Sequence, residues 1–107
     1  MTVLIKVHKT YRGVVAISDE ELVGKIFYEG ERQLDIRENF YRGEPYEELG
    51  ELVKIIKDLA MEDSTFNIVG KESVNAALKA GIISKEGIKT VDGIPYALVL
   101  LWEEQSV

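Results

Sequence analysis

Apolar and polar residues alternate at the start of the chain, and this alternation predicts a strand over residues 2–8. A polar loop that ends in glycine separates it from the β-branched run 14–17, so the two segments predict a hairpin with a five-residue loop. Ser18 lies three residues before Glu21, which is the spacing of a capping box. We therefore expect a helix of one or two turns that Gly24 ends.

The middle of the chain predicts a second hairpin and then a long helix. The segments 26–28 and 33–37 flank a glycine turn, and residues 38–43 follow as a loop with two adjacent aromatic residues. Proline is favoured at the first position of a helix, so Pro45 is expected to open a helix over 45–62. Its apolar residues recur at spacings of three and four, as an amphipathic helix requires: Leu49, Leu52, Val53, Ile56, Leu59.

The last third of the chain predicts a strand, a helix and a final hairpin. Residues 66–69 form a short apolar strand, and the helical pattern of 71–80 ends at a glycine. An Asp-Gly turn joins the segments 88–91 and 94–102. The order predicts an α+β fold with a mixed, mostly antiparallel sheet and two or three helices packed on it.

Composition supports one folded domain over residues 1–107, with 102–107 as a frayed tail. Hydrophobic residues make up 46% of the chain and charged residues 30%, which is typical of folded domains. No apolar run approaches the roughly 20 residues that span a bilayer. We therefore expect no membrane segment, and the start of the chain does not resemble a signal peptide. The absence of cysteine excludes disulfides, thiolate nucleophiles and cysteine-ligated metal sites.

The formal net charge of −6 argues against direct DNA binding, since phosphate binding depends on clustered Lys and Arg. The acidity is concentrated in residues 38–63, where eight acids face three bases. We interpret this segment as the solvated face of the long helix. Residues 1–37 carry six acids and six bases, so that part of the chain is free to present a local basic surface.

Few residues carry evident chemistry. His8 is the only histidine and has no sequence neighbours for a metal site or a catalytic dyad. The acids Asp19–Glu21 are explained by helix capping, although paired carboxylates also serve as general bases or Mg²⁺ ligands. The sequence predicts no metal site, cofactor or catalytic residue.

A weaker signal is the strand–glycine–helix junction near residue 70. A phosphate loop would need glycine at position 65, which is Thr65, so that motif is absent. The free N–H groups of a helix start can nevertheless hold an anion. Asn67, Gly70, Lys71 and Ser73 are therefore candidate anion-binding residues, although the glycine is equally explained as a turn residue.

A second candidate site lies in the first 42 residues, where aromatic and basic residues are interleaved. Aromatic stacking combined with arginine contacts is a common way to bind single-stranded RNA. The simpler alternative is that the aromatic residues are core and the charged residues form exposed ion pairs. The candidate binding residues are Gly24, Lys25, Phe27, Phe40, Tyr41 and Arg42.

Four segments together resemble a small archaeal family, the domain-of-unknown-function family numbered 424. They are Asp19–Phe27, Phe40–Gly43, Asn67–Gly70 and Gly93–Pro95, and their order and spacing fit over residues 3–100. The resemblance implies an archaeal, cytoplasmic protein with one small α/β domain. It implies no activity.

Two hypotheses about function follow. The first is a non-catalytic binding module associated with the archaeal translation machinery, with a ribonucleoprotein or a basic protein as partner. It predicts that Lys25→Ala or Tyr41→Ala weakens binding with little change in melting temperature. The second is a small anionic-ligand or nucleotide-binding protein, or an enzyme that uses Asp19 or Glu21 together with lysine. The sequence leaves the oligomeric state open.

Overall fold

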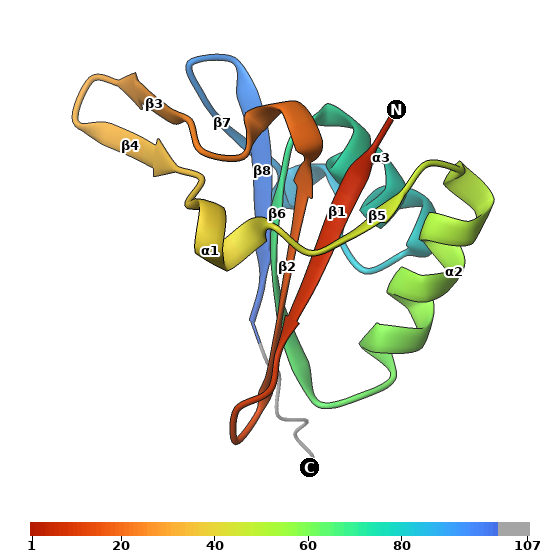
Figure 1. Ribbon diagram of the computed structural model, residues 1–107. Helices are drawn as coiled ribbons and strands as arrows, with labels where there is room; N and C mark the ends of the chain where they lie inside the picture. Colours follow the sequence, from red (N-terminus) through yellow and green to blue (C-terminus); the bar gives the residue numbers. More distant parts are fainter. Residues whose placement is uncertain (101–107) are drawn as a thin grey trace, which may run out of the picture.

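A computed structural model describes residues 1–100 and confirms the α+β fold. A six-stranded sheet has the order β5-β1-β2-β6-β8-β7, as the arrangement in Figure 1 shows. Among its strands only β2 and β6 run parallel, so the sheet is mixed and mostly antiparallel. The strands are β1 (Val3–His8), β2 (Gly13–Asp19), β5 (Glu44–Tyr46), β6 (Ser64–Val69), β7 (Lys89–Val91) and β8 (Ile94–Val99).

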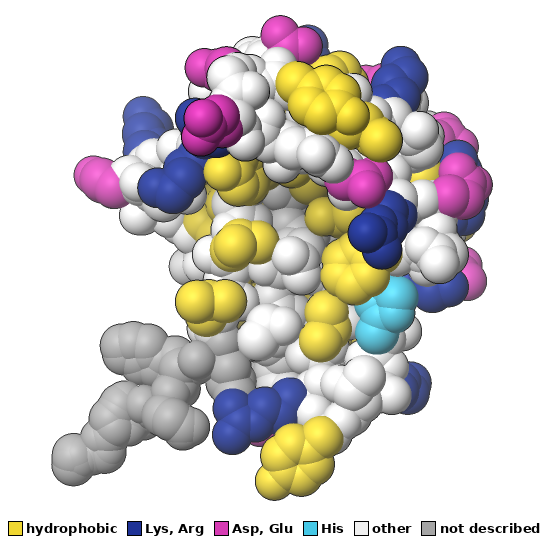
Figure 2. Space-filling view, turned by 90° about the vertical axis from the view of Figure 1, so that its left-hand side faces the viewer, with side chains coloured by type: hydrophobic (Ala, Val, Ile, Leu, Met, Phe, Trp, Pro, Cys, Tyr) yellow, Lys and Arg dark blue, Asp and Glu magenta, His cyan; other side chains and the backbone are white. Residues whose placement is uncertain are grey.

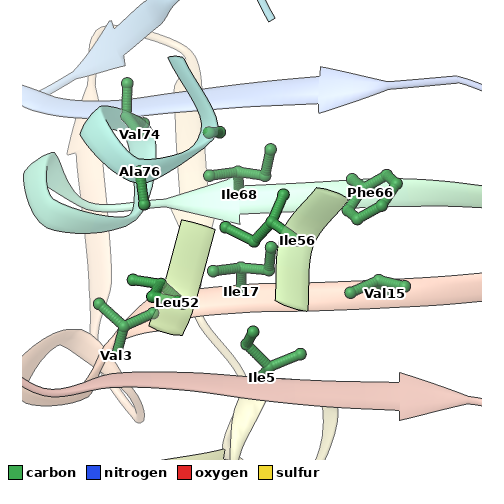
Figure 3. Packing of buried hydrophobic residues seen from close by; sticks show 11 residues of the cluster. Val3, Ile5, Val15, Ile17, Leu52, Ile56, Phe66, Ile68, Val74 and Ala76 are labelled. Atoms are coloured by element: carbon green, nitrogen blue, oxygen red, sulfur yellow. The ribbon is translucent and has the colours of Figure 1, made fainter. Parts of the chain in front are cut away.

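Two helices cover one face of this sheet. They are α2 (Leu49–Ala60) and α3 (Lys71–Ala80), both on the right of the sheet in Figure 1. Alternate residues of the central strands point toward them, as the period of a strand requires. The resulting main core, much of which Figure 3 shows, buries Val3, Ile5, Val15, Ile17, Leu52, Ile56, Phe66, Ile68, Val74, Ala76 and Ala77.

The other face of the sheet is only partly covered. A two-stranded hairpin of β3 (Ile26–Glu29) and β4 (Arg32–Asp35) and the short helix α1 (Glu38–Tyr41) lie over one end of it, on the left in Figure 1. They form a second apolar cluster with the strands beneath. Its buried residues are Ala16, Ile36, Tyr41 and Val69, and Leu22, Val23, Phe27, Leu34, Phe40, Ile94 and Tyr96 pack around them.

The predicted start of the long helix is wrong. Pro45 lies in strand β5, where it is opposite Leu4 of β1, and α2 begins at Leu49. Proline is tolerated there because β5 is an edge strand. The helix is capped by the side chain of Glu48, which accepts hydrogen bonds from the backbone N–H groups of Gly50 (3.1 Å) and Glu51 (2.9 Å).

The predicted capping box at Ser18 is also wrong. Ser18 belongs to strand β2, and its hydroxyl donates to the carbonyl oxygen of Asp19. Strand β2 continues through Asp19 because it is paired on both sides, with β1 and with β6. The expected helix is reduced to a single 3-10 turn, η1 (Glu20–Leu22).

The remaining predictions agree more closely. Helix α3 spans the predicted 71–80 and ends at Gly81, whose φ of +79° is a left-handed C-cap. The final hairpin is confirmed as far as Val99, and the predicted loop 38–43 contains helix α1. A second 3-10 turn, η2 (Lys85–Gly87), precedes β7. The predicted tail 102–107 lies outside the described residues.

Within residues 1–100, none of the helices has the length and apolar character needed to cross a membrane.

Candidate functional site

The six predicted binding residues come together around α1 and the base of the β3–β4 hairpin. Phe27, Phe40 and Tyr41 belong to the second apolar cluster. A Cβ on Gly24 would lie 3.5 Å from Oε1 of Glu38, so Gly24 faces the same helix. These residues therefore lie in one region of the structure.

Their environments differ from those expected of a binding surface. Tyr41 is 7% exposed, and burial raises the pKa of its phenol to about 12. Arg42 pairs with Glu38 at 2.6 Å and with Glu20 at 3.7 Å, so its charge is neutralised locally. Lys25 is exposed and remains a usable probe of binding. The structure changes the expectation for Tyr41→Ala, because loss of a buried ring must affect folding.

A more accessible surface lies beside this region, on the end of the sheet face that the hairpin leaves uncovered. Lys6, Asn67 and Leu98 are aligned across the sheet on this face, with Ala16 between the first two. A second row, two residues further along each strand, contains His8, Val14 and Thr65. We call the accessible residues of both rows the open strip: Lys6, His8, Val14, Thr65, Asn67 and Leu98.

The open strip has polar side chains, Asn67 and Thr65, near its centre, Lys6 and His8 along β1 and the apolar Leu98 on β8. Leu98, on β8, is 56% exposed. None of the six residues of the strip is acidic. Figure 2 shows this face: hydrophobic side chains lie across its middle, and Lys and Arg side chains lie at its lower end.

An aromatic wall bounds the strip on one side. The rings of His8 and Phe40 are stacked, with centroids 4.6 Å apart and planes 16° apart. Nε2 of His8 lies 2.9 Å from the carbonyl oxygen of Phe40, which fixes the orientation of the imidazole. Figure 2 shows the histidine, in cyan, next to a hydrophobic side chain at the edge of this face. The wall therefore has a defined geometry before any ligand arrives.

The four predicted anion-binding residues do not all lie together in the structure. Asn67 lies in the open strip, whereas Gly70, Lys71 and Ser73 lie at the start of α3. The backbone donors of that start are already used. Asp19 accepts hydrogen bonds from the N–H of Glu72 (3.1 Å), the N–H of Ser73 (2.8 Å) and the hydroxyl of Ser73 (2.7 Å). An external anion would have to displace this carboxylate to reach them.

Asp19 thus caps a helix that lies more than fifty residues away in the sequence. It is 2% exposed and ends strand β2 directly beneath the start of α3. A Cβ on Gly70 would lie 2.3 Å from the carboxyl carbon of Asp19, so the carboxylate occupies the space of a side chain. Beside this contact is a cavity of about 210 Å³, lined by Asp19, Glu21, Leu22, Gly70, Lys71, Gly93, Ile94 and Pro95.

Burial raises the pKa of Asp19, and its hydrogen bonds to Ser73 and Glu72 oppose this effect. A carboxyl with a raised pKa binds its proton more readily in the folded state. Its contribution to stability is therefore complete below the unfolded pKa and is lost as pH rises through the folded pKa.

Acidification from pH 7 toward pH 3.5 should shift the stability difference between wild type and Asp19→Asn in favour of the wild type. Urea unfolding of both proteins at each pH measures the difference in their free energies of unfolding. A change of this difference in favour of Asp19→Asn would contradict the prediction.

Sequence reasoning missed Asp19 as a remote cap and missed the open strip as a surface. The capping role has no local signal, because donor and acceptor are more than fifty residues apart in the sequence. Alternation identifies the outer face of each strand, but it does not reveal which end of that face the hairpin covers. Within residues 1–100, no three His, Cys, Asp or Glu side chains are grouped to hold a metal ion.

Comparison with known proteins agrees with the fold. The model of a family described as "Protein of unknown function (DUF424)" matches residues 8–101. The chain belongs to this family. An uncharacterised conserved protein from Methanopyrus kandleri has a similar crystal structure, with a TM-score of 0.84 and 25% identity over 100% of this chain and 98% of that chain. No match was found among curated proteins.

The segments that carry the resemblance to the DUF424 family have clear structural roles. Three of the four supply residues to the cavity beside Asp19, and the N–H of Gly70 donates to the carbonyl oxygen of Pro95 at 2.8 Å. In the fourth, Gly43 crosses β1 so closely that a Cβ would lie 2.1 Å from the carbonyl oxygen of Ile5. These DUF424 motif residues therefore hold the chain segments together.

Proposed function

We propose that this protein is a non-catalytic binding module that acts through the open strip. The observation that carries the proposal is the part of the sheet face that the β3–β4 hairpin and α1 leave uncovered within residues 1–100, where Leu98 is exposed although the opposite face is packed against two helices. Exposed apolar residues that form a continuous surface are typical of interaction sites.

The chemistry of the buried polar groups supports a binding role more than a catalytic one. His8 is tied to the carbonyl oxygen of Phe40, and both carboxylate oxygens of Asp19 accept hydrogen bonds from the start of α3. Within the described part of the chain, neither group has a second titratable side chain as its hydrogen-bond partner, which general acid–base catalysis ordinarily employs.

We further propose that the partner is a ribonucleoprotein of the archaeal translation machinery, and that the protein acts in the cytoplasm. The basic border of the open strip supports this proposal despite the acidic composition of the chain. The acidic side chains of α2 lie on the opposite face of the sheet, so they do not oppose an anionic partner at the strip.

Co-sedimentation tests the proposal. In an archaeal host, a tagged copy should run with ribosomal particles on a sucrose gradient at low salt and should leave them at high salt. Leu98→Glu should move the protein to the top of the gradient, because it replaces the most exposed apolar side chain of the strip with a charge. Met61→Glu is the matched control, since Met61 is 86% exposed, ends α2 and receives the same charge.

Two results would contradict the proposal. The wild type could remain at the top of the gradient at low salt, or Leu98→Glu could sediment as the wild type does. Thermal melting of both variants establishes that any loss of association does not come from unfolding.

A further inference from the structure

We infer that the ligand of the open strip is a single-stranded segment of RNA. This inference rests on the proposed function, since it names the part of the ribonucleoprotein that the strip contacts. It is drawn from three properties of the strip: the groups at its centre, the aromatic rings at its border and the distribution of charge around it.

The centre of the strip carries groups that can read a base edge. Asn67 and Thr65 both lie on strand β6 and point to the open face. An amide provides donors and an acceptor, and a hydroxyl provides both roles in one group. Leu98 on one side and Val14 on the other supply apolar contact for the base planes. The Watson–Crick edges of bases are accessible only where the bases are unpaired, which favours a single strand over a duplex.

Aromatic rings stand at the border of the strip, where bases can stack. The His8–Phe40 pair forms a rigid wall along β1. At the tip of the β1–β2 loop, Tyr11 is 96% exposed and the guanidinium of Arg12 lies 6.0 Å from the centre of its ring. Stacking on such rings tolerates every base, so it provides affinity without sequence preference.

The charges around the strip suit a phosphate backbone. Lys6 belongs to the strip, and Lys9 and Arg12 lie in the β1–β2 loop that follows His8. Glu38 of α1 is paired with Arg42, and Asp35 of β4 is paired with Arg37. The strip therefore combines local positive charge with stacking and hydrogen-bonding groups, as single-strand binding sites do.

The test is fluorescence anisotropy with the purified full chain and a labelled 12-nucleotide RNA of randomised sequence. The same sequence pool as single-stranded DNA and a duplex RNA of equal length are the comparison ligands. We expect the RNA single strand to bind most tightly and its Kd to rise steeply with salt. Asn67→Ala and Lys6→Ala should each weaken binding about tenfold, since a base or phosphate contact contributes at roughly that level.

Leu98→Glu should weaken binding by tenfold or more, and Met61→Glu should change it less than about twofold. Circular dichroism shows which variants are folded. If Asn67→Ala unfolds, Lys6→Ala still tests the inference. Lys6 is a partly exposed side chain at one side of the strip, so its truncation should leave the fold intact.

The outcomes separate this inference from the function on which it rests. Suppose that the RNA fails to bind at low salt while Leu98→Glu still abolishes co-sedimentation. The ligand of the open strip is then a protein, so the RNA inference is overturned and the proposed function stands. Equal binding of all strip variants, or equal binding of DNA or duplex RNA, also overturns the RNA inference. If co-sedimentation fails as well, the proposed function is overturned with it.

Discussion

Gly70→Ala is expected to destabilise the protein by about 4 kcal/mol. The backbone of Gly70 has φ +105° and ψ 154°, a region that is essentially restricted to glycine and costs other residues about 1–3 kcal/mol. The new methyl group would also meet the carboxyl group of Asp19 at 2.3 Å and push it away from the start of α3. Each buried donor left without a partner costs about 1–3 kcal/mol more. Urea unfolding followed by circular dichroism measures the change.

Gly81→Ala provides the matched control for this prediction. Gly81 also has a positive φ, +79°, but within residues 1–100 no other side chain or backbone segment approaches within 4 Å of the place that a Cβ would take. Only the backbone cost of about 1 kcal/mol therefore applies. Combining Gly70→Ala with Asp19→Ala should cost less than the sum of the two changes, because the clash disappears with the carboxylate. Strict additivity would show that Asp19 and Gly70 do not act through their contact.

The relation of Asp19 to Gly70 also shows where prediction from sequence succeeds and where it fails. Strand alternation and helical spacing depend on local geometry, so α3 and the strands other than β5 were predicted closely, as was the body of α2 around Leu52. The roles of Pro45 and Ser18 were misjudged because each residue has a favoured local use that strand pairing overrides. Such pairing joins distant segments, and no local sequence pattern indicates which segments pair.

The candidate site was predicted with similar limits. The sequence named Phe27, Phe40 and Tyr41 as candidates, yet it did not distinguish a buried ring from an exposed one. That distinction depends on where the β3–β4 hairpin lies on the sheet. The open strip could not be predicted from the sequence, because only the pairing of β1, β2, β6 and β8 brings its residues into rows.

Tyr41→Ala is expected to destabilise the protein by about 4 kcal/mol, through loss of buried ring contacts and the cavity left behind. Tyr41 is 7% exposed, packs with Ala16, Ile36 and Val69, and meets the ring of Phe40 edge-on at 5.0 Å. Chemical denaturation measures the effect. Tyr28→Ala is the matched control, since Tyr28 lies on the neighbouring β3–β4 hairpin but is 61% exposed and should change stability by less than about 0.5 kcal/mol.

The phenol of Tyr41 adds a test in alkaline solution. Burial raises its pKa to about 12, so the folded state holds the proton more tightly than the unfolded state. The stability that this provides is complete below the ordinary tyrosine pKa of about 10 and is lost as pH rises through the folded value. Wild type should therefore lose stability relative to Tyr41→Phe between about pH 10 and pH 12. Parallel pH dependence of the two proteins would mean that the hydroxyl reaches water, and α1 would then cover the sheet only loosely.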